Sequence, residues 1–335
     1  MSRRPTAMFA MDAPNLPQLF PPDLLAWLRE LLDIDPAGVV TDFGDPALRS
    51  RLARVEVLVT GWGCPPLDCH ALDALPRLHT VLHTGGTVKR LLPPEGRARG
   101  LTVSSAAAQN ALPVAEYTLG MILLLGKGVF SAQEDRRAAW HRLPDLARSD
   151  IGNMGRRVGL IGASAVGRRV IELLRPFDFD VVLYDPYVDA AAARSLGVRK
   201  SGLEDLLADS SIVSVHAPAT PETWHMIDAG RLALLPDGSA LINTARGSLV
   251  DTEALVRELA TGRIRAVLDV TDPEPLPVDS PLFDLPNVIL TPHIAGSQGN
   301  ELRRLGAAVV AEAERLRMGA PLAQRVEVAH LDRTA

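Results

Sequence analysis

Short apolar runs alternate with longer segments of helical periodicity along almost the whole chain. In the N-terminal third, apolar runs rich in β-forming residues cover residues 6–11, 55–60, 78–83 and 101–104. Between the first two, LPQLFPPDLLAWLRELL has the apolar spacing of a helix. Strands that alternate with helices are typical of parallel βαβ units. The pattern therefore predicts an α/β fold.

The second half repeats this alternation after one long periodic segment, residues 111–140. That segment is apolar up to Leu125 and charged after Gly128, so we expect a helix that joins two domains. Six further apolar runs then follow: RVGLI, VVLY, IVSVHA, ALIN, RAVLDV and NVIL. Six strands are the number in a dinucleotide-binding sheet. Residues 301–318 are amphipathic and are expected to form a helix that packs on a domain already made.

Composition narrows the class of protein. The chain has 335 residues, about twice a ~150-residue domain, with 47% hydrophobic and 22% charged residues and a net charge of −5. These values predict a soluble two-domain protein and disfavour nucleic acid as a partner. Cys64 and Cys69 lack the spacing of a zinc or redox pair, and no charge-free stretch is apolar enough for a membrane span. We expect a cytoplasmic protein without a metal site.

A glycine-rich loop follows the run RVGLI. Gly162, Ser164 and Gly167 occupy the three positions of the G-x-G-x-x-G fingerprint, with Ala165 and Val166 between the last two. In this motif backbone N–H groups and a helix N-terminus bind a pyrophosphate. Serine at the middle position would crowd the pyrophosphate unless its hydroxyl bonds to it.

Asp185, 18 residues after Gly167, ends the next apolar run. A carboxylate there accepts hydrogen bonds from the ribose hydroxyls and repels a 2′-phosphate, so the sequence favours NAD over NADP.

Five further segments resemble one family. They are VAEYTLGMILLL, VSVHAPATPET, INTARGSLVDTEAL, LDVTDPEPLP and TPHIAGS. Together they resemble the D-isomer-specific 2-hydroxyacid dehydrogenases, over about residues 55–318. The resemblance implies a Rossmann-type doubly wound NAD domain (113–297) and a flavodoxin-like α/β substrate domain of discontinuous sequence (1–112 and 298–335). It also implies a homodimer.

The resemblance places the family's catalytic residues at Arg246, Glu274 and His293. An arginine fork binds a carboxylate and polarises a carbonyl. A histidine, with an ordinary pKa near ~6.5, can exchange the proton at neutral pH. Glu274, between two prolines, is expected to hold its carboxylate against the imidazole, and Asp272 is its nearest competitor.

Other positions follow from the same resemblance with less support. Further cofactor contacts are expected at His216, Pro218, Thr223, Thr244, Ala245 and Asp269. Substrate contacts are expected at Trp62 and at Gly85, Gly86 and Thr87, whose backbone N–H groups would bind the substrate carboxylate. Many relatives read G-x-G-x-D here, whereas this chain has Thr87 and Lys89. Lys89 is either a contact for a second anionic group or a solvated lysine.

These residues predict an oxidoreductase that exchanges a hydride between NAD(H) and C2 of a D-2-hydroxy or 2-oxo acid. Two alternatives stay open on the same fold. One is an NAD(H)-sensing binding protein similar to a corepressor, and the other is an enzyme that oxidises phosphonate or phosphite.

Overall fold

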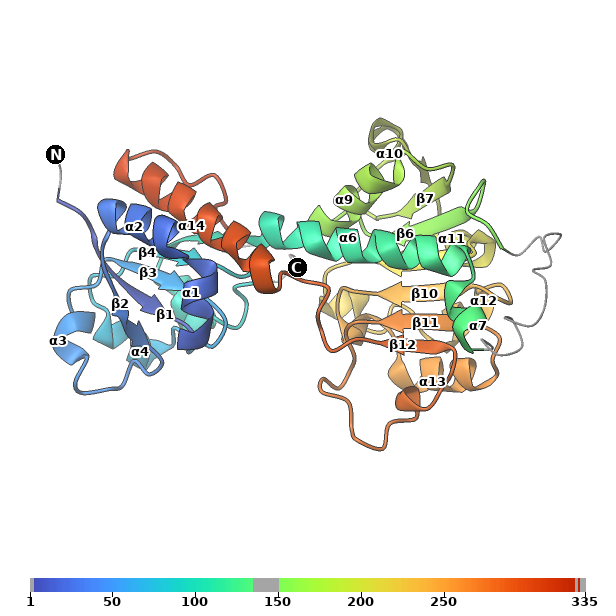
Figure 1. Cartoon of the computed structure of the whole chain (residues 1–335), viewed down its shortest axis with the longest axis horizontal. Helices are drawn as coiled ribbons and strands as arrows, with labels where there is room; N and C mark the ends of the chain where they lie inside the picture. Colours follow the sequence, from blue (N-terminus) through green and yellow to red (C-terminus); the bar gives the residue numbers. More distant parts are fainter. Residues whose placement is uncertain (1–2, 135–150, 329–330, 332–335) are drawn as a thin grey trace. The chain divides into compact units, whose positions relative to one another are not determined.

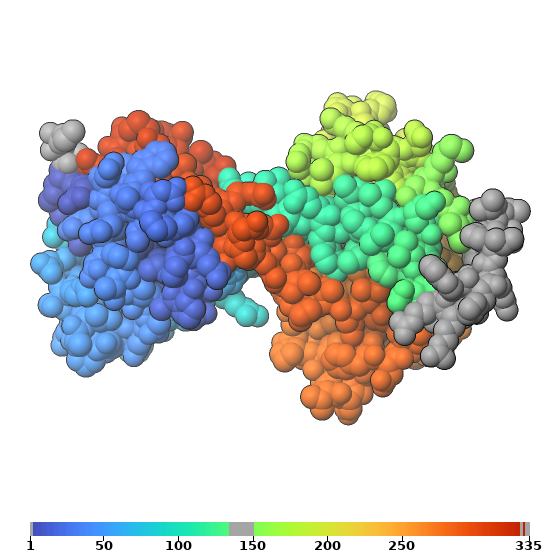
Figure 2. All heavy atoms as spheres, viewed as in Figure 1, coloured from blue at the N-terminus to red at the C-terminus, as the bar shows by residue number. Residues whose placement is uncertain are grey.

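The computed structural model describes residues 3–134, 151–328 and 331. The chain divides into two compact units, residues 1–111 with 297–334 and residues 112–296 (Figure 1). The boundaries lie one residue from those expected from the sequence. In the space-filling view the C-terminal helix lies against N-terminal residues, which shows how the first unit is assembled from both ends of the chain (Figure 2).

The first unit is built on a five-stranded sheet. Its strands are all parallel and run in the order β2-β1-β3-β4-β5. Their bounds are β1 Thr6–Ala10, β2 Asp33–Val40, β3 Val57–Thr60, β4 Thr80–His83 and β5 Thr102–Ser105. This is the flavodoxin strand order, so the predicted fold class of this domain is confirmed.

One strand of this sheet was not predicted. β2 has the sequence DIDPAGVV, and its Pro36 and Gly38 hide the β pattern. Proline is tolerated in an edge strand, where its missing N–H faces no partner. The register shift between Ala7 and Phe9 of β1 also accommodates the irregular strand.

Helices cover both faces of the first sheet. They are α1 Leu16–Leu19, α2 Pro22–Leu31, α3 Arg49–Leu52, α4 Cys69–Ala74, α5 Pro94–Ala98 and α14 Leu302–Arg317. The single helix expected over residues 16–32 is wrong, because Pro21 and Pro22 end α1 and start α2. α14 packs on α1 and α2, and a Cβ on its Gly306 would lie 1.8 Å from the Leu19 carbonyl oxygen. Only glycine allows this approach.

The second unit contains a seven-stranded parallel sheet. The order is β12-β11-β10-β9-β6-β7-β8. The strands are β6 Arg157–Ile161, β7 Asp180–Tyr184, β8 Arg199–Lys200, β9 Ile212–Val215, β10 Ala240–Asn243, β11 Arg265–Leu268 and β12 Val288–Leu290. Numbered within the unit, this is the Rossmann order 3-2-1-4-5-6 with a seventh strand added. All six predicted strands are present, and the two-residue β8 is additional.

The helices of this unit pack on both faces of its sheet (Figure 1). They are α7 Val129–Glu134, α9 Ala165–Leu174, α10 Ala190–Leu196, α11 Leu203–Asp209, α12 Ala229–Leu234 and α13 Thr252–Ala260. The unit boundary falls inside α6, Ala107–Gly126. The expected helix over 111–140 is interrupted after α6 at Gly128, whose φ is +65°, and its last six residues lie outside the described part of the chain. No helix in the described ranges has both the length and the apolarity to cross a bilayer.

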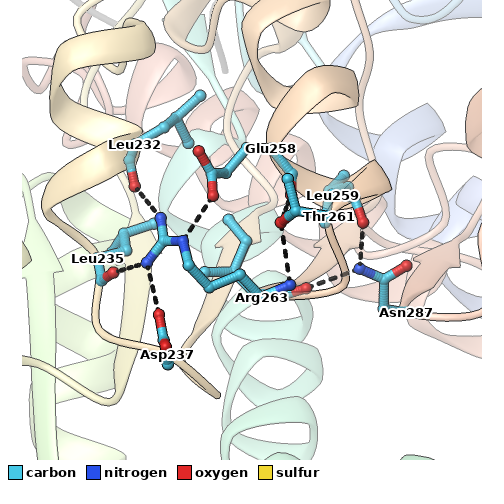
Figure 3. A network of polar contacts seen from close by, with 9 residues as sticks. Leu232, Leu235, Asp237, Glu258, Leu259, Thr261, Arg263 and Asn287 are labelled. Atoms are coloured by element: carbon cyan, nitrogen blue, oxygen red, sulfur yellow. Dashed lines mark hydrogen bonds and ion pairs between the residues drawn. The ribbon is translucent and has the colours of Figure 1, made fainter.

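Arg263 ties together the turns at the amino ends of β10 and β11 (Figure 3). Its guanidinium donates to the Leu232 carbonyl at 3.0 Å, to the Leu235 carbonyl and, at 2.7 Å, to the Glu258 carboxylate. The buried amide of Asn287 adds two more hydrogen bonds to backbone carbonyls of the turn between α13 and β11. The Leu235 carbonyl follows the last residue of α12, where carbonyls have no intrahelical partner, and Arg263 supplies its donor.

Replacing Arg263 by Met should destabilise the protein by about 1–3 kcal/mol, because the part-buried carbonyls of Leu232 and Leu235 each lose a donor while the apolar stem is kept. Urea unfolding monitored by circular dichroism measures the change. Arg257→Met is the matched control, since among the described residues Arg257 on α13 pairs with exposed Glu253 at 3.8 Å. Equal stability of the two variants would contradict the role given to Arg263.

Candidate functional site

The glycine-rich loop requires glycine at two of its three positions. Gly162 follows β6 with φ +99°, and a Cβ there would lie 2.8 Å from the backbone nitrogen of Ala217. A Cβ on Gly167 would lie 2.1 Å from the Gly162 carbonyl oxygen. The loop and the first turn of α9 are therefore pressed against each other and against the end of β9. This arrangement places the N-terminus of α9 at the loop, and a helix N-terminus favours an anion.

Ser164 occupies the middle glycine position. It is the N-cap of α9, and its Oγ accepts a hydrogen bond from the Gly167 N–H at 3.3 Å. The side chain thus turns back onto its own helix, and its hydroxyl hydrogen can still be donated to a phosphate oxygen. Serine at this position is compatible with a pyrophosphate.

Asp185 lies directly beside the loop. Its carboxylate accepts the Ala163 N–H and the Tyr187 N–H, each at 2.8 Å. These two bonds fix the carboxylate at the carboxyl end of β7, next to the glycine-rich loop. Each oxygen keeps a second lone pair with which to accept a ribose hydroxyl.

His216 provides a test of whether a dinucleotide fits this loop. It follows β9, is 3% exposed, and its Cβ lies 3.4 Å from the position that a Cβ on Gly167 would take. Neither ring nitrogen has a hydrogen-bond partner among the described residues, and burial lowers the pKa of His216 to about 4. A neutral imidazole with unused polar atoms under a phosphate-binding loop fits a polar ligand at this place.

The loop after His216 is held by its own side chains. Thr223 Oγ donates to the Pro218 carbonyl at 2.6 Å and accepts the Thr220 N–H at 2.9 Å. The hydroxyl of Thr223, predicted to contact the cofactor, therefore has a first task in shaping the loop. Thr244 is buried, and its Oγ lies 3.3 Å from that of Thr118 on α6.

Arg246 follows β10 in a turn stabilised by Asn243. The Asn243 side chain accepts the Ala245 N–H at 3.1 Å and donates to the Arg246 carbonyl at 2.8 Å. Arg246 itself donates to the Ala245 carbonyl at 2.6 Å. Sequence reasoning missed Asn243, although a polar residue that ends an otherwise apolar strand is a signal for such a turn.

Asp269 holds the segment that carries His293. This carboxylate is 3% exposed and accepts three hydrogen bonds, all from residues 291–295. The donors are Thr291 Oγ at 2.6 Å, the Ile294 N–H at 2.8 Å and the Ala295 N–H at 2.9 Å. The predicted contact of Asp269 with the nicotinamide stays a prediction. Its position as the anchor of the histidine segment was missed.

His293 and Glu274 form a hydrogen-bonded pair. Nδ1 of His293 lies 2.6 Å from Oε1 of Glu274, and both side chains are about half exposed. Because a carboxylate only accepts, Nδ1 carries a hydrogen and Nε2 is the nitrogen that can exchange a proton with a ligand. Among the described residues, the carboxylate in contact with His293 is that of Glu274 and not that of Asp272.

Topology brings the three predicted catalytic residues to one edge of the sheet. Arg246 follows β10, Glu274 follows β11 and His293 follows β12, and these strands are adjacent and parallel. Ligands of open α/β sheets bind at the carboxyl ends of the strands. The site is thus a cation and a carboxylate–imidazole pair at the ligand-binding edge.

The predicted substrate loop lies in the first unit, after β4. Neither Gly85 nor Gly86 has a positive φ, and a Cβ on Gly85 would lie 2.5 Å from Nε2 of His83. A Cβ on Gly86 would lie 3.6 Å from Nδ2 of Asn110, whose Oδ1 accepts the Ser297 N–H at 2.9 Å. Asn110 was missed by the sequence reasoning. Its polarity within an apolar helix start was the available signal.

The structure also describes Trp62 and the turn at Thr87 and Lys89, which the sequence analysis predicted to lie near the substrate. Trp62 is 41% exposed and follows β3. The backbone N–H of Lys89 donates to Thr87 Oγ at 3.3 Å, which closes a short turn. Thr87 therefore has a local structural partner in addition to any substrate.

Comparison with known proteins agrees with this geometry. Residues 119–295 match the family described as D-isomer specific 2-hydroxyacid dehydrogenase, NAD binding domain. A D-3-phosphoglycerate dehydrogenase from Mycobacterium bovis is 36% identical over 251 residues, 75% of this chain and 47% of that protein. A glyoxylate reductase from Korarchaeum cryptofilum is 33% identical over 253 residues, 74% of this chain and 75% of that protein. The chain spans about half the length of the phosphoglycerate dehydrogenases that it matches.

Solved structures extend the similarity to the first unit. A phosphoglycerate oxidoreductase from Rhizobium etli superimposes with a TM-score of 0.80 and 25% identity, covering 97% of this chain and 98% of that one. A D-lactate dehydrogenase from Aquifex aeolicus, solved with NAD and lactic acid, gives 0.71 and 28%, covering 93% and 96%. The chain therefore belongs to the D-isomer specific 2-hydroxyacid dehydrogenase family, and NAD is the cofactor of its second unit.

Proposed function

We propose that this protein is an NAD-dependent D-2-hydroxyacid dehydrogenase that exchanges a hydride between NAD(H) and C2 of a 2-oxo or 2-hydroxy acid. The observation that carries the proposal is the 2.6 Å contact between His293 and Glu274, at the sheet edge where Arg246 follows the adjacent strand β10. The homodimer stays a prediction from the family resemblance, and the cytoplasmic location stays a prediction from the sequence.

In the proposed reduction each side chain has one task. Arg246 binds the substrate carboxylate and polarises the carbonyl. Bound NADH supplies the hydride. Protonated His293 gives its Nε2 proton to the carbonyl oxygen, so that the carbonyl group becomes a hydroxyl. In the oxidation the neutral imidazole takes that proton back.

Glu274 and Asp269 prepare His293 for this task. The Glu274 carboxylate fixes the orientation of the ring by its bond to Nδ1. The Asp269 carboxylate holds the backbone on the far side of the histidine. His293 has φ +55°, a conformation that needs such support in a residue other than glycine.

The substrate is proposed at the level of its class. The relatives named above include a D-3-phosphoglycerate dehydrogenase and a glyoxylate reductase, so the acids to be tested range from small to phosphorylated. NADH consumption with glyoxylate, pyruvate and 2-oxo acids with a terminal phosphate, and NAD⁺ reduction with phosphite and a phosphonate, distinguish the candidates.

Arg246→Gln should lower kcat/KM by at least ~10²-fold, the effect of losing one preorganised donor, while the Kd for NADH is unchanged. Arg246→Lys should recover part of the activity, because a point charge cannot form the bidentate contact. Turnover is measured with the best acid of the panel, and NADH binding by fluorescence titration.

Two outcomes would count against the assignment. Unchanged turnover in Arg246→Gln would remove Arg246 from the reaction. A parent protein that binds NADH tightly but turns over no acid would instead support the NAD(H)-sensing alternative.

Glu274→Gln should lower kcat/KM for reduction by about tenfold, because a neutral amide holds the imidazole by a weaker hydrogen bond than a carboxylate does. Asp272→Asn is the matched control and should leave kcat/KM unchanged. A loss of turnover in the Asp272 variant and not in the Glu274 variant would reassign the partner of His293.

NADH should be preferred to NADPH by at least about tenfold in kcat/KM, equivalent to ~1.4 kcal/mol, because the Asp185 carboxylate repels a 2′-phosphate. Asp185→Ser should reduce the preference. Asp189→Ser is the control, since that carboxylate caps α10 instead. Equal use of both cofactors by the parent protein would show that Asp185 does not meet the ribose.

A further inference from the structure

We propose that His83 is a positioning residue that bridges Thr60 and the backbone of Thr87, and so holds the loop of residues 85–87 in the shape that binds the substrate carboxylate. The inference rests on the proposed function for the meaning of "substrate". Its structural part, the bridge and its effect on the loop, does not depend on turnover.

The bridge begins at paired strand ends. Thr60 is the last residue of β3, His83 is the last residue of β4, and the two are partners in the parallel register. Nδ1 of His83 lies 2.9 Å from Oγ of Thr60, and the two residues are 7% and 0% exposed. A second hydrogen bond joins the His83 ring to the Thr87 backbone. One buried side chain thus spans from β3 to the end of the loop.

The chemistry of these partners selects one form of the ring. Burial lowers the pKa of His83 to about 4, although the hydrogen bond to the Thr87 backbone opposes this shift. The ring is therefore neutral at ordinary pH, with one donor and one acceptor. Because the bond to the Thr87 backbone raises the pKa of the ring, the ring donates it and the Thr87 carbonyl accepts it. Nδ1 faces Thr60, so the donating N–H is on Nε2. Nδ1 then accepts the hydroxyl hydrogen of Thr60.

The same ring explains the glycine above it. Gly85 does not have a positive φ, so its backbone conformation does not demand glycine. A Cβ at this position would lie 2.5 Å from Nε2 of His83, which leaves no room for another residue. The loop is therefore laid directly over the imidazole. Removal of the ring's hydrogen bonds would leave the Thr60 hydroxyl and the Thr87 carbonyl unpaired and let the loop change shape.

Two variants separate hydrogen bonding from volume. His83→Phe keeps a ring but loses both bonds, and His83→Gln keeps an N–H that can reach the Thr87 carbonyl. His79→Gln is the matched control, because exposed His79 lies just before the same strand and its ring bonds, within the described part of the chain, to the neighbouring Thr80.

With glyoxylate or the best acid of the panel, His83→Phe should raise KM about tenfold with a smaller change in kcat, and Gln should recover most of the loss. The Kd for NADH should stay the same, since that cofactor belongs to the second unit. If His83 had a structural role alone, His83→Phe would lower the stability of the protein without raising KM more than it lowers kcat. Equal KM values in His83→Phe and the parent, or a Gln variant as impaired as Phe, would overturn the proposal.

Measurements without substrate test the bridge by itself. Amide hydrogen exchange of residues 84–90 should be faster in His83→Phe than in the parent and unchanged in His79→Gln. The ¹⁵N shifts of the parent's histidine rings should show His83 as the Nε2–H tautomer. An Nδ1–H tautomer or unaltered exchange would overturn the proposal. A parent protein that reduces no acid but passes both measurements would refute the proposed function and leave the bridge standing.

Discussion

The second unit depends on one buried carboxylate, that of Asp269. A charge that is 3% exposed is costly unless donors surround it. Here the Ile294 and Ala295 N–H groups and the Thr291 hydroxyl supply them. Because the Thr291 hydroxyl donates its hydrogen to Asp269, its oxygen accepts the phenol hydrogen of Tyr117 on α6 at 2.8 Å. Burial raises the pKa of this phenol. The segment around His293 therefore has little freedom, and the left-handed conformation of the histidine follows from it.

In the first unit, a buried neutral group holds a loop in place as the Asp269 carboxylate does in the second. His83 needs no counter-charge, because a buried neutral imidazole is satisfied by one hydroxyl and one carbonyl. Thr84 adds a bond from its hydroxyl to the Thr60 carbonyl at 3.0 Å. His83 at the end of β4 fixes the loop that follows its own strand, whereas Asp269 after β11 fixes the loop that follows the neighbouring strand β12. Each loop is thereby prepared before a ligand binds, so that little binding energy is lost in ordering it.

Most of the fold could be predicted because apolar strands and the glycine loop have local patterns. The failures have local causes too. Pro36 and Gly38 interrupt the β pattern of β2 in the sequence, and Pro21 divides into two helices a segment whose apolar spacing is helical throughout. The site was predictable where a residue type implies its chemistry, as for His293. The anchoring bonds of Asp269 and the bridge of His83 were not, since they join residues that only the folded chain brings together.

The two units differ in what their sequences reveal about function. The family match covers residues 119–295 and so includes Arg246, Glu274 and His293. The segment of residues 85–89 lies outside that match and contains this chain's departures from the family pattern, Thr87 and Lys89. A reaction is defined by groups that must act on the same atoms in every member, whereas a substrate is selected by groups that touch the part that varies. The similarity to known dehydrogenases therefore supports the type of reaction. The choice of substrate acid depends on the surface of the loop after β4 and on the buried His83 that holds this loop.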